Sequence, residues 1–237
     1  MGILAICRLI ALISVPGLDS STLREFLAEQ AASSSQSLVG LYSMFTGGAL
    51  EQCAVGALGI MPYISATIII QLLSAVVPSL SKLAREEGGR TKIIQYGRYL
   101  TVLLCLGQGL AMSFGWENPG AIFQGFEGRL VMFADENIWF YRIQTVLVLT
   151  TGTLLLMWLG EQITERGIGN GVSLVITIGI IARFPDALKL AVSKFLPVGD
   201  SEPEFNYFYA IAFIILLVLV VAAVVAMTQA QRKIPVQ

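Results

Sequence analysis

The chain contains no histidine, and only 13% of its 237 residues are charged. Without histidine, Ser-His and Cys-His nucleophiles and the usual zinc sites are excluded. Cysteine is also scarce: Cys7, Cys53 and Cys105 form no CxxC pair, and we interpret them as small buried hydrophobic residues. The net charge of −1 and the absence of a basic cluster give no indication of nucleic-acid binding. No cofactor is predicted.

Apolar residues make up 55% of the chain, and its mean hydropathy is +0.75. A soluble globular domain has about 25% charged and about 45–50% apolar residues. The shortage of charge is too large for a surface covered by water. The composition therefore predicts an integral membrane protein, and the helical spans that follow place it in the all-α class.

Long runs without charged residues predict the membrane spans. A helix that crosses about 30 Å of hydrocarbon needs about 20 apolar residues. We predict six spans and treat residues 1–237 as one membrane domain, although the first span is short and is interrupted by Arg8. The predicted spans are 2–15, 57–79, 96–115, 140–160, 168–190 and 207–229.

The loops between these spans indicate the orientation. Lys and Arg are concentrated in the short segments 80–98 and 160–170 and in the tail. Because positive charge in short loops marks the cytoplasmic side, we expect both the N-terminus and the tail to face the cytoplasm.

The second predicted span carries a stripe of residues on one helical face. Ile60, Ile64, Thr67 and Gln71 follow each other at i, i+4, i+7 and i+11. The polar end of this stripe should face other helices or a cavity. An interhelical hydrogen bond is the simplest interpretation of Gln71. Pro62 is tolerated because the first N–H groups of a helix lack partners in any case.

The segment before this span is too apolar for a free loop and too broken for a span. This segment, residues 38–56, has the sequence LVGLYSMFTGGALEQCAVG and is interrupted by glycines. A short re-entrant helix surrounded by protein fits this pattern, and a surface helix is the alternative.

Three stretches together resemble the SecY family, whose members form the central subunit of a protein-conducting channel. They are MFTGGAL at 44–50, LGIMPYISATIIIQLL at 58–73 and MWLGEQITERGIGNGVSLVI at 157–176. SVPGLD at 14–19 and QRKIPVQ at the end of the chain are also similar to this family. The resemblance implies a SecY-like membrane helix bundle, comprising the N-terminal half and the sixth span.

The resemblance also implies roles for individual positions. A pore ring of branched apolar side chains would comprise Ile60, Ile64, Val172 and Ile176, and Thr67 and Gln71 would lie at a lateral gate. Residues 44–56 would be a plug, a short re-entrant helix that includes Phe45, Thr46, Gly47, Gly48, Ala49 and Leu50. Asn170 and Ser173 would belong to a polar network at the mouth of the fifth span.

The function that follows from the resemblance is passive. Such a channel moves unfolded polypeptides with signal sequences across the bacterial cytoplasmic membrane and inserts membrane proteins into it. The implied partners are SecE- and SecG-like small subunits, the motor ATPase SecA and the ribosome, and no enzymatic activity is expected. Because the family has ten spans, we interpret this chain as a fragment.

Other functions find less support. A solute transporter would carry an ionisable residue within a span, and Arg8 is the candidate. An intramembrane protease would need a histidine or paired aspartates inside the bilayer, and the sequence offers neither. Glu161 and Glu165 are better explained as a solvated cytoplasmic turn than as an acid–base pair. The GIGNG sequence at 167–171 follows a membrane helix instead of a strand, which argues against dinucleotide binding.

Overall fold

The computed structural model describes residues 2–23, 46–86, 88–122, 130–132, 138–167, 169–195 and 207–229. These residues are mostly helical, and the β-type contacts among them are isolated bridges, Ser14 with Ala54 and Leu18 with Val131. The prediction of an all-α membrane helix bundle is confirmed. The chain forms two units, Met1–Arg183 and Phe184–Gln237, and one helix continues from the first into the second.

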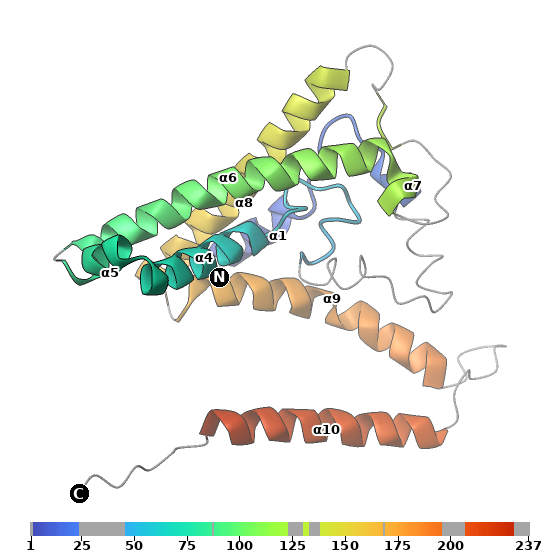
Figure 1. Ribbon diagram of the computed structural model, residues 1–237. Helices are drawn as coiled ribbons and strands as arrows, with labels where there is room; N and C mark the ends of the chain where they lie inside the picture. The colour runs from blue at the N-terminus through green and yellow to red at the C-terminus, as the bar shows by residue number, and fades with distance from the viewer. Residues whose placement is uncertain are drawn as a thin grey trace, which may run out of the picture. The chain divides into compact units, whose positions relative to one another are not determined.

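Figure 1 labels the helices in the order in which they follow one another along the chain. Their bounds are α1 Gly2–Ile10, α4 Met61–Val76, α5 Pro78–Arg85, α6 Gly89–Glu117, α7 Pro119–Ile122, α8 Ile138–Arg166, α9 Gly171–Phe195 and α10 Tyr207–Gln229.

Helix α1 is shorter than the span predicted over residues 2–15. It has nine residues and ends at Ile10, and turns follow it. A turn at Pro16 and Gly17 then prevents the helix from continuing, and Gly17 has a φ of +91°. Such a helix rises about 14 Å, which is less than half of the hydrocarbon thickness.

The second predicted span, over residues 57–79, begins later and ends earlier as a helix. Gly59 has a φ of +60°, so regular helix starts only at Met61 and contains Pro62 in its first turn. At the other end, Pro78 has no backbone N–H to continue the hydrogen bonds of α4. It also places the preceding residue, Val77, in an extended conformation. Helix α5 consequently leaves α4 at an angle of 99°.

Helices α6 and α8 form the centre of the first unit, and each has 29 residues. Two ion pairs join them in an antiparallel arrangement, Arg98 with Glu161 near one end and Glu117 with Arg142 near the other. Between these pairs the helices meet through small residues, and Gly109 lies against Val146. Close contact through small residues is typical of helix packing inside membranes.

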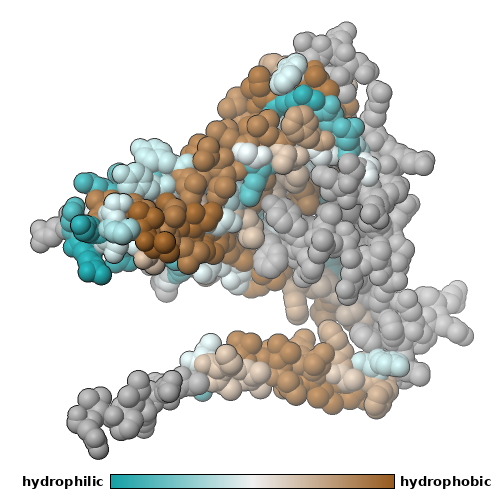
Figure 2. Space-filling model, in the orientation of Figure 1, coloured by the Kyte–Doolittle hydropathy of each residue, from teal (hydrophilic) through white to brown (hydrophobic). Residues whose placement is uncertain are grey.

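The surface of the first unit is divided by polarity. Figure 2 shows apolar side chains over the middle of α4, α6 and α8, with hydrophilic ones gathered near the α5–α6 turn and near the opposite ends of α6 and α8. Among the described residues, α6, α8, α9 and α10 are long and apolar enough to span a membrane, and the bent pair α4–α5 is a fifth candidate. The chain is a multi-pass membrane protein, and the count of six spans stays a prediction.

The second unit contains the end of α9 and the whole of α10. Pro185 lies inside α9, just after the boundary between the units. Apart from Thr228 and Gln229 at its end, α10 carries almost only apolar and aromatic side chains. A helix that is apolar on all sides suits a lipid or protein environment and not water.

Candidate functional site

The four side chains predicted to form a pore ring lie at the start of α4 and near the start of α9. Ile60 immediately precedes α4, with Ile64 one turn further on, and Val172 and Ile176 lie one turn apart near the start of α9. Ile60 and Ile176 line one cavity, whereas Ile64 and Val172 line another. The two helices therefore pass this point in opposite directions. Each helix thus contributes one of the four residues to each cavity lining. We call the place where α4 and α9 pass each other the junction, and the role of the four residues as a ring stays a prediction.

Helix α8 closes a third side of this junction at Gly160. A Cβ atom built at Gly160 would lie 3.7 Å from both Cδ1 of Ile60 and Cγ2 of Val172. The Thr164 hydroxyl donates to the Gly160 carbonyl over 3.0 Å and accepts the Gly171 N–H over 2.8 Å. These hydrogen bonds attach the start of α9 to α8, so they position Val172 at the junction.

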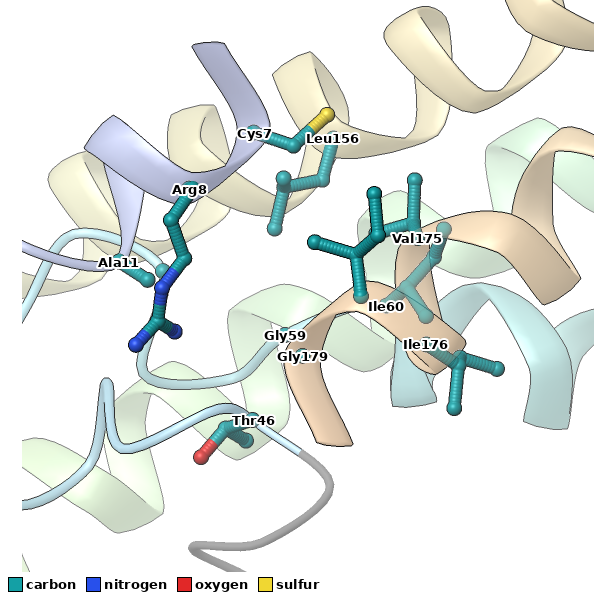
Figure 3. Close-up of a pocket in the computed structure, with 12 residues that line it drawn as sticks. Cys7, Arg8, Ala11, Thr46, Gly59, Ile60, Leu156, Val175, Ile176 and Gly179 are labelled. Carbon is teal, nitrogen blue, oxygen red and sulfur yellow. The ribbon is translucent and has the colours of Figure 1, made fainter. Parts of the chain in front are cut away.

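The smaller cavity has a volume of about 40 Å³ and lies between α1, α9 and the segment that precedes α4. Figure 3 shows Arg8 extending from α1 into this region, with Thr46 beneath it and Ile60, Val175 and Ile176 on the opposite side. A cavity of this size holds one or more water molecules when polar partners are present. The Arg8 guanidinium is such a polar partner, and the rest of the lining is mostly apolar.

The larger cavity has a volume of about 400 Å³ and is lined by α4, α6, α8 and α9. Its wall includes the Arg98–Glu161 pair, which is bidentate, with Nε to Oε1 at 3.1 Å and Nη2 to Oε2 at 2.7 Å. Ile64 and Val172 form the apolar part of the lining nearest to the smaller cavity. A mixed lining of this kind admits water up to these apolar side chains.

The two residues predicted for a lateral gate also line the larger cavity. The Thr67 hydroxyl donates to the Tyr63 carbonyl of its own helix over 2.8 Å. Gln71 is exposed, and within the described residues its carboxamide makes no interhelical hydrogen bond. The interhelical contact predicted for Gln71 is thus not formed among the described residues, and it stays a prediction. Both residues line the larger cavity, and their role at a gate stays a prediction.

The predicted plug, residues 44–56, is described from Thr46 onward; Met44 and Phe45 lie outside the described residues. Its described part consists of successive turns, so the expected α-helix is not present there. The reason is backbone conformation: Gly47, Gly48 and Cys53 have φ values of +65°, +87° and +46°. Left-handed residues interrupt a right-handed helix.

The turns of this segment are packed inside the unit. Residues 46–50 are all buried, and Leu50 and Cys53 belong to the same core cluster as Trp116. Backbone hydrogen bonds from the Val15 N–H to the Cys53 carbonyl and from the Val55 N–H to the Ile13 carbonyl, both 2.8 Å long, attach it to the chain after α1. The segment is thus surrounded by protein, and its role as a plug stays a prediction.

The acidic pair and the glycine-rich turn have structural partners. Glu161 binds Arg98, and Glu165 accepts a long hydrogen bond of 3.5 Å from Gln162. The Asn170 side chain caps α9 by accepting the Val172 N–H over 3.0 Å. Among the described side chains, no group of three or more Cys, Asp and Glu is placed to hold a metal ion.

The SecY family model matches residues 54–237, which include all four predicted ring residues. The chain belongs to the SecY family.

Relatives of the SecY family match the whole chain. It is 44% identical over 238 residues to the protein translocase subunit SecY of Streptomyces coelicolor, covering 100% of this chain and 52% of that protein. It is 45% identical to the Streptomyces griseus protein with the same coverage. The Escherichia coli K12 protein is 38% identical over 237 residues, which are 100% of this chain and 50% of the relative. The chain therefore spans about half the length of the curated relatives it matches.

In this SecY-family chain, sequence reasoning missed several residues that shape the site. Gly160, Thr164 and Gly171 hold α8 and α9 together, and Gly179 and Arg183 contact the turns at 46–51. The helical spacing of 172, 176, 179 and 183 is the signal that could have identified the last two, because these positions share one face of α9.

Proposed function

We propose that this chain forms part of a SecY-type protein-conducting channel, which moves unfolded polypeptides across the bacterial cytoplasmic membrane and releases hydrophobic segments into it. The observation that supports this proposal best is the junction of Ile60, Ile64, Val172 and Ile176 between two cavities. Branched apolar side chains at such a constriction exclude water and oppose ions, yet yield to a polypeptide.

In this proposal the turns at 46–51 act as the plug beside the constriction. They lie on the side of Ile60 and Ile176, whereas the larger cavity opens on the side of Ile64 and Val172. The larger cavity would receive the substrate, and the plug would close the path beyond the ring. Thr67 and Gln71 would form part of the lateral gate, with a partner helix supplied by the other half of the channel.

The chain would act with partners that supply energy and complete the ring. SecE- and SecG-like subunits would stabilise the channel, and SecA or the ribosome would drive the substrate. The basic segments around Lys82, Arg85 and Arg166 would face the cytoplasm, with the N-terminus on the same side. Ion pairing and capping account for Glu161 and Asn170, so we propose no catalytic role for them.

A hybrid protein tests the function directly. This chain would replace the matching half of Escherichia coli SecY, and the hybrid would be expressed in cells depleted of their own SecY. A hybrid built with the corresponding half of the Streptomyces coelicolor protein is the matched control. We expect both hybrids to restore export of a secreted reporter. Export by the control hybrid alone would reject the proposal.

The ring assignment is tested in the same hybrid by replacing Ile64 with asparagine. The variant should conduct ions at rest and export reporters with defective signal sequences, because a polar side chain lets water bridge the constriction. Ile69→Asn is the control, since Ile69 is exposed on α4 and outside both cavity linings. Equal ion conductance in the two variants would show that Ile64 does not form a barrier.

A further inference from the structure

We propose that Arg8 and Arg183 form a two-point latch that holds the turns at residues 46–51 against α1 and α9. This inference rests on the proposed function, because it explains how the plug is kept in its closed position. The latch is defined by two contacts: Arg8 with the Gly47 carbonyl, and Arg183 with Glu51.

The first contact joins α1 to the segment. The Arg8 guanidinium donates from Nη1 to the Gly47 carbonyl over 2.6 Å. A Cβ atom at Gly47 would lie 2.7 Å from that nitrogen and 3.1 Å from Cα of Gly179. Only glycine therefore permits the backbone to approach both helices so closely, and its φ of +65° favours glycine as well. A charged donor makes this hydrogen bond stronger than one between neutral groups.

The second contact joins α9 to the other end of the same turns. The Arg183 guanidinium forms an ion pair with the Glu51 carboxylate, and the two side chains are 29% and 25% exposed. Arg183 also lies directly over Gly48, where a Cβ atom would be 2.9 Å from Nε. The guanidinium consequently covers one residue of the turn and binds a second.

The latch shares a helix face with the proposed ring. Val172, Ile176, Gly179 and Arg183 follow each other at i, i+4, i+7 and i+11 along α9. The first two line the cavities at the constriction, the third meets Gly47, and the fourth binds Glu51. A movement of this face that widens the constriction would therefore also pull on the segment.

The two contacts should respond differently to salt. Arg8 binds a neutral carbonyl, whereas Arg183 and Glu51 are a partly exposed ion pair, which high salt weakens. The latch thus has one point that is insensitive to ionic strength and one that is sensitive to it.

Cys53 provides a native reporter of the latch. It lies two residues after Glu51, its thiol is free, and its side chain is 0% exposed. Release of the turns would expose this thiol to a small maleimide. Cys105, which is also free and 0% exposed, lies on α6 and serves as an internal reference.

The test measures N-ethylmaleimide labelling of each cysteine by mass spectrometry, with the full chain in lipid nanodiscs. We expect Arg183→Gln and Arg8→Met each to raise the labelling rate of Cys53 about tenfold, the change that loss of one charged hydrogen bond worth about 1.4 kcal/mol would cause. High salt should raise the rate in the wild type but not in Arg183→Gln. Arg98→Gln, which removes an ion pair between α6 and α8, should leave it unchanged.

Exchanging the charges, with Arg183→Glu and Glu51→Arg together, should return the rate toward that of the wild type. Wild-type labelling of Cys53 in both single variants would overturn the latch. A parallel rise at Cys105 would also overturn it, because the whole bundle would then be loosened. Labelling requires no transport, so a failure of the hybrid export test would reject the proposed function without altering this result.

Discussion

Replacing Gly171 by alanine should destabilise the junction of α8 and α9, whereas the same change at Gly160, on the other side of that contact, should not. A Cβ atom at Gly171 would overlap the Gly160 carbonyl oxygen and lie 2.8 Å from its carbon and 2.9 Å from Cβ of Ile163. These atoms belong to the backbone or are fixed to it, so the helices themselves must separate. Overpacking of this kind costs about 2 kcal/mol.

Alanine at Gly160 meets no such obstacle. Its nearest neighbours, including side-chain atoms of Ile60 and Val172, would lie at 3.7 Å, which is ordinary van der Waals contact. Alanine in a helix interior is favoured over glycine by about 0.5–1 kcal/mol. The two glycine-to-alanine changes should therefore have opposite signs, although they act on one contact.

The measurement is unfolding of the full chain by sodium dodecyl sulfate in mixed micelles, followed by tryptophan fluorescence. We expect the midpoint to fall for Gly171→Ala and to stay or rise for Gly160→Ala. In a thermal scan, about 2 kcal/mol corresponds to a fall of about 4–8 °C for a chain of this size. Wild-type stability of Gly171→Ala, or a loss of more than about 1 kcal/mol for Gly160→Ala, would refute the packing described for this junction.

Further predictions concern ion pairs, polar contacts and packing of α8. Each is a change in stability, measured by the same unfolding assay. Arg142→Gln should cost about 2 kcal/mol, because this side chain is 16% exposed and also lies over two aromatic rings, whereas Arg98→Gln, at 45% exposed, should cost less than about 1 kcal/mol. Equal losses would contradict this ranking. Thr164→Val should lose about 1–2 kcal/mol through its two backbone hydrogen bonds, and a neutral effect would show that water replaces them. Gly152→Ala should cost about 1–3 kcal/mol, since its Cβ would overlap the Val55 carbonyl, and unchanged stability would mean that the segment before α4 yields easily.

The sequence by itself determined the membrane-spanning character and the positions of the long helices. In lipid, an apolar run can form its backbone hydrogen bonds within itself only as a helix. For this reason α6, α8 and α10 lie close to the residue ranges predicted for the spans. Pro78 acts locally: its missing N–H breaks the helix at Val77, although residues 57–79 are predicted as one span. The resemblance to the family predicts the ring residues, whereas physical reasoning alone would treat them as ordinary helix packing.

Only the tertiary structure decided which of these residues meet. Glu51 and Arg183 are separated by 132 positions, and no helical or strand period relates them. The contact of Gly160 with Gly171 depends on how closely two helices approach, which is a property of the pair and of neither helix alone. The turns at 46–51 were expected to be helical from their apolar character, but left-handed conformations at Gly47 and Gly48 bring the backbone within reach of two arginines. Local sequence sets the helices through hydrogen bonds within each segment, whereas long-range packing sets the cavities and the latch.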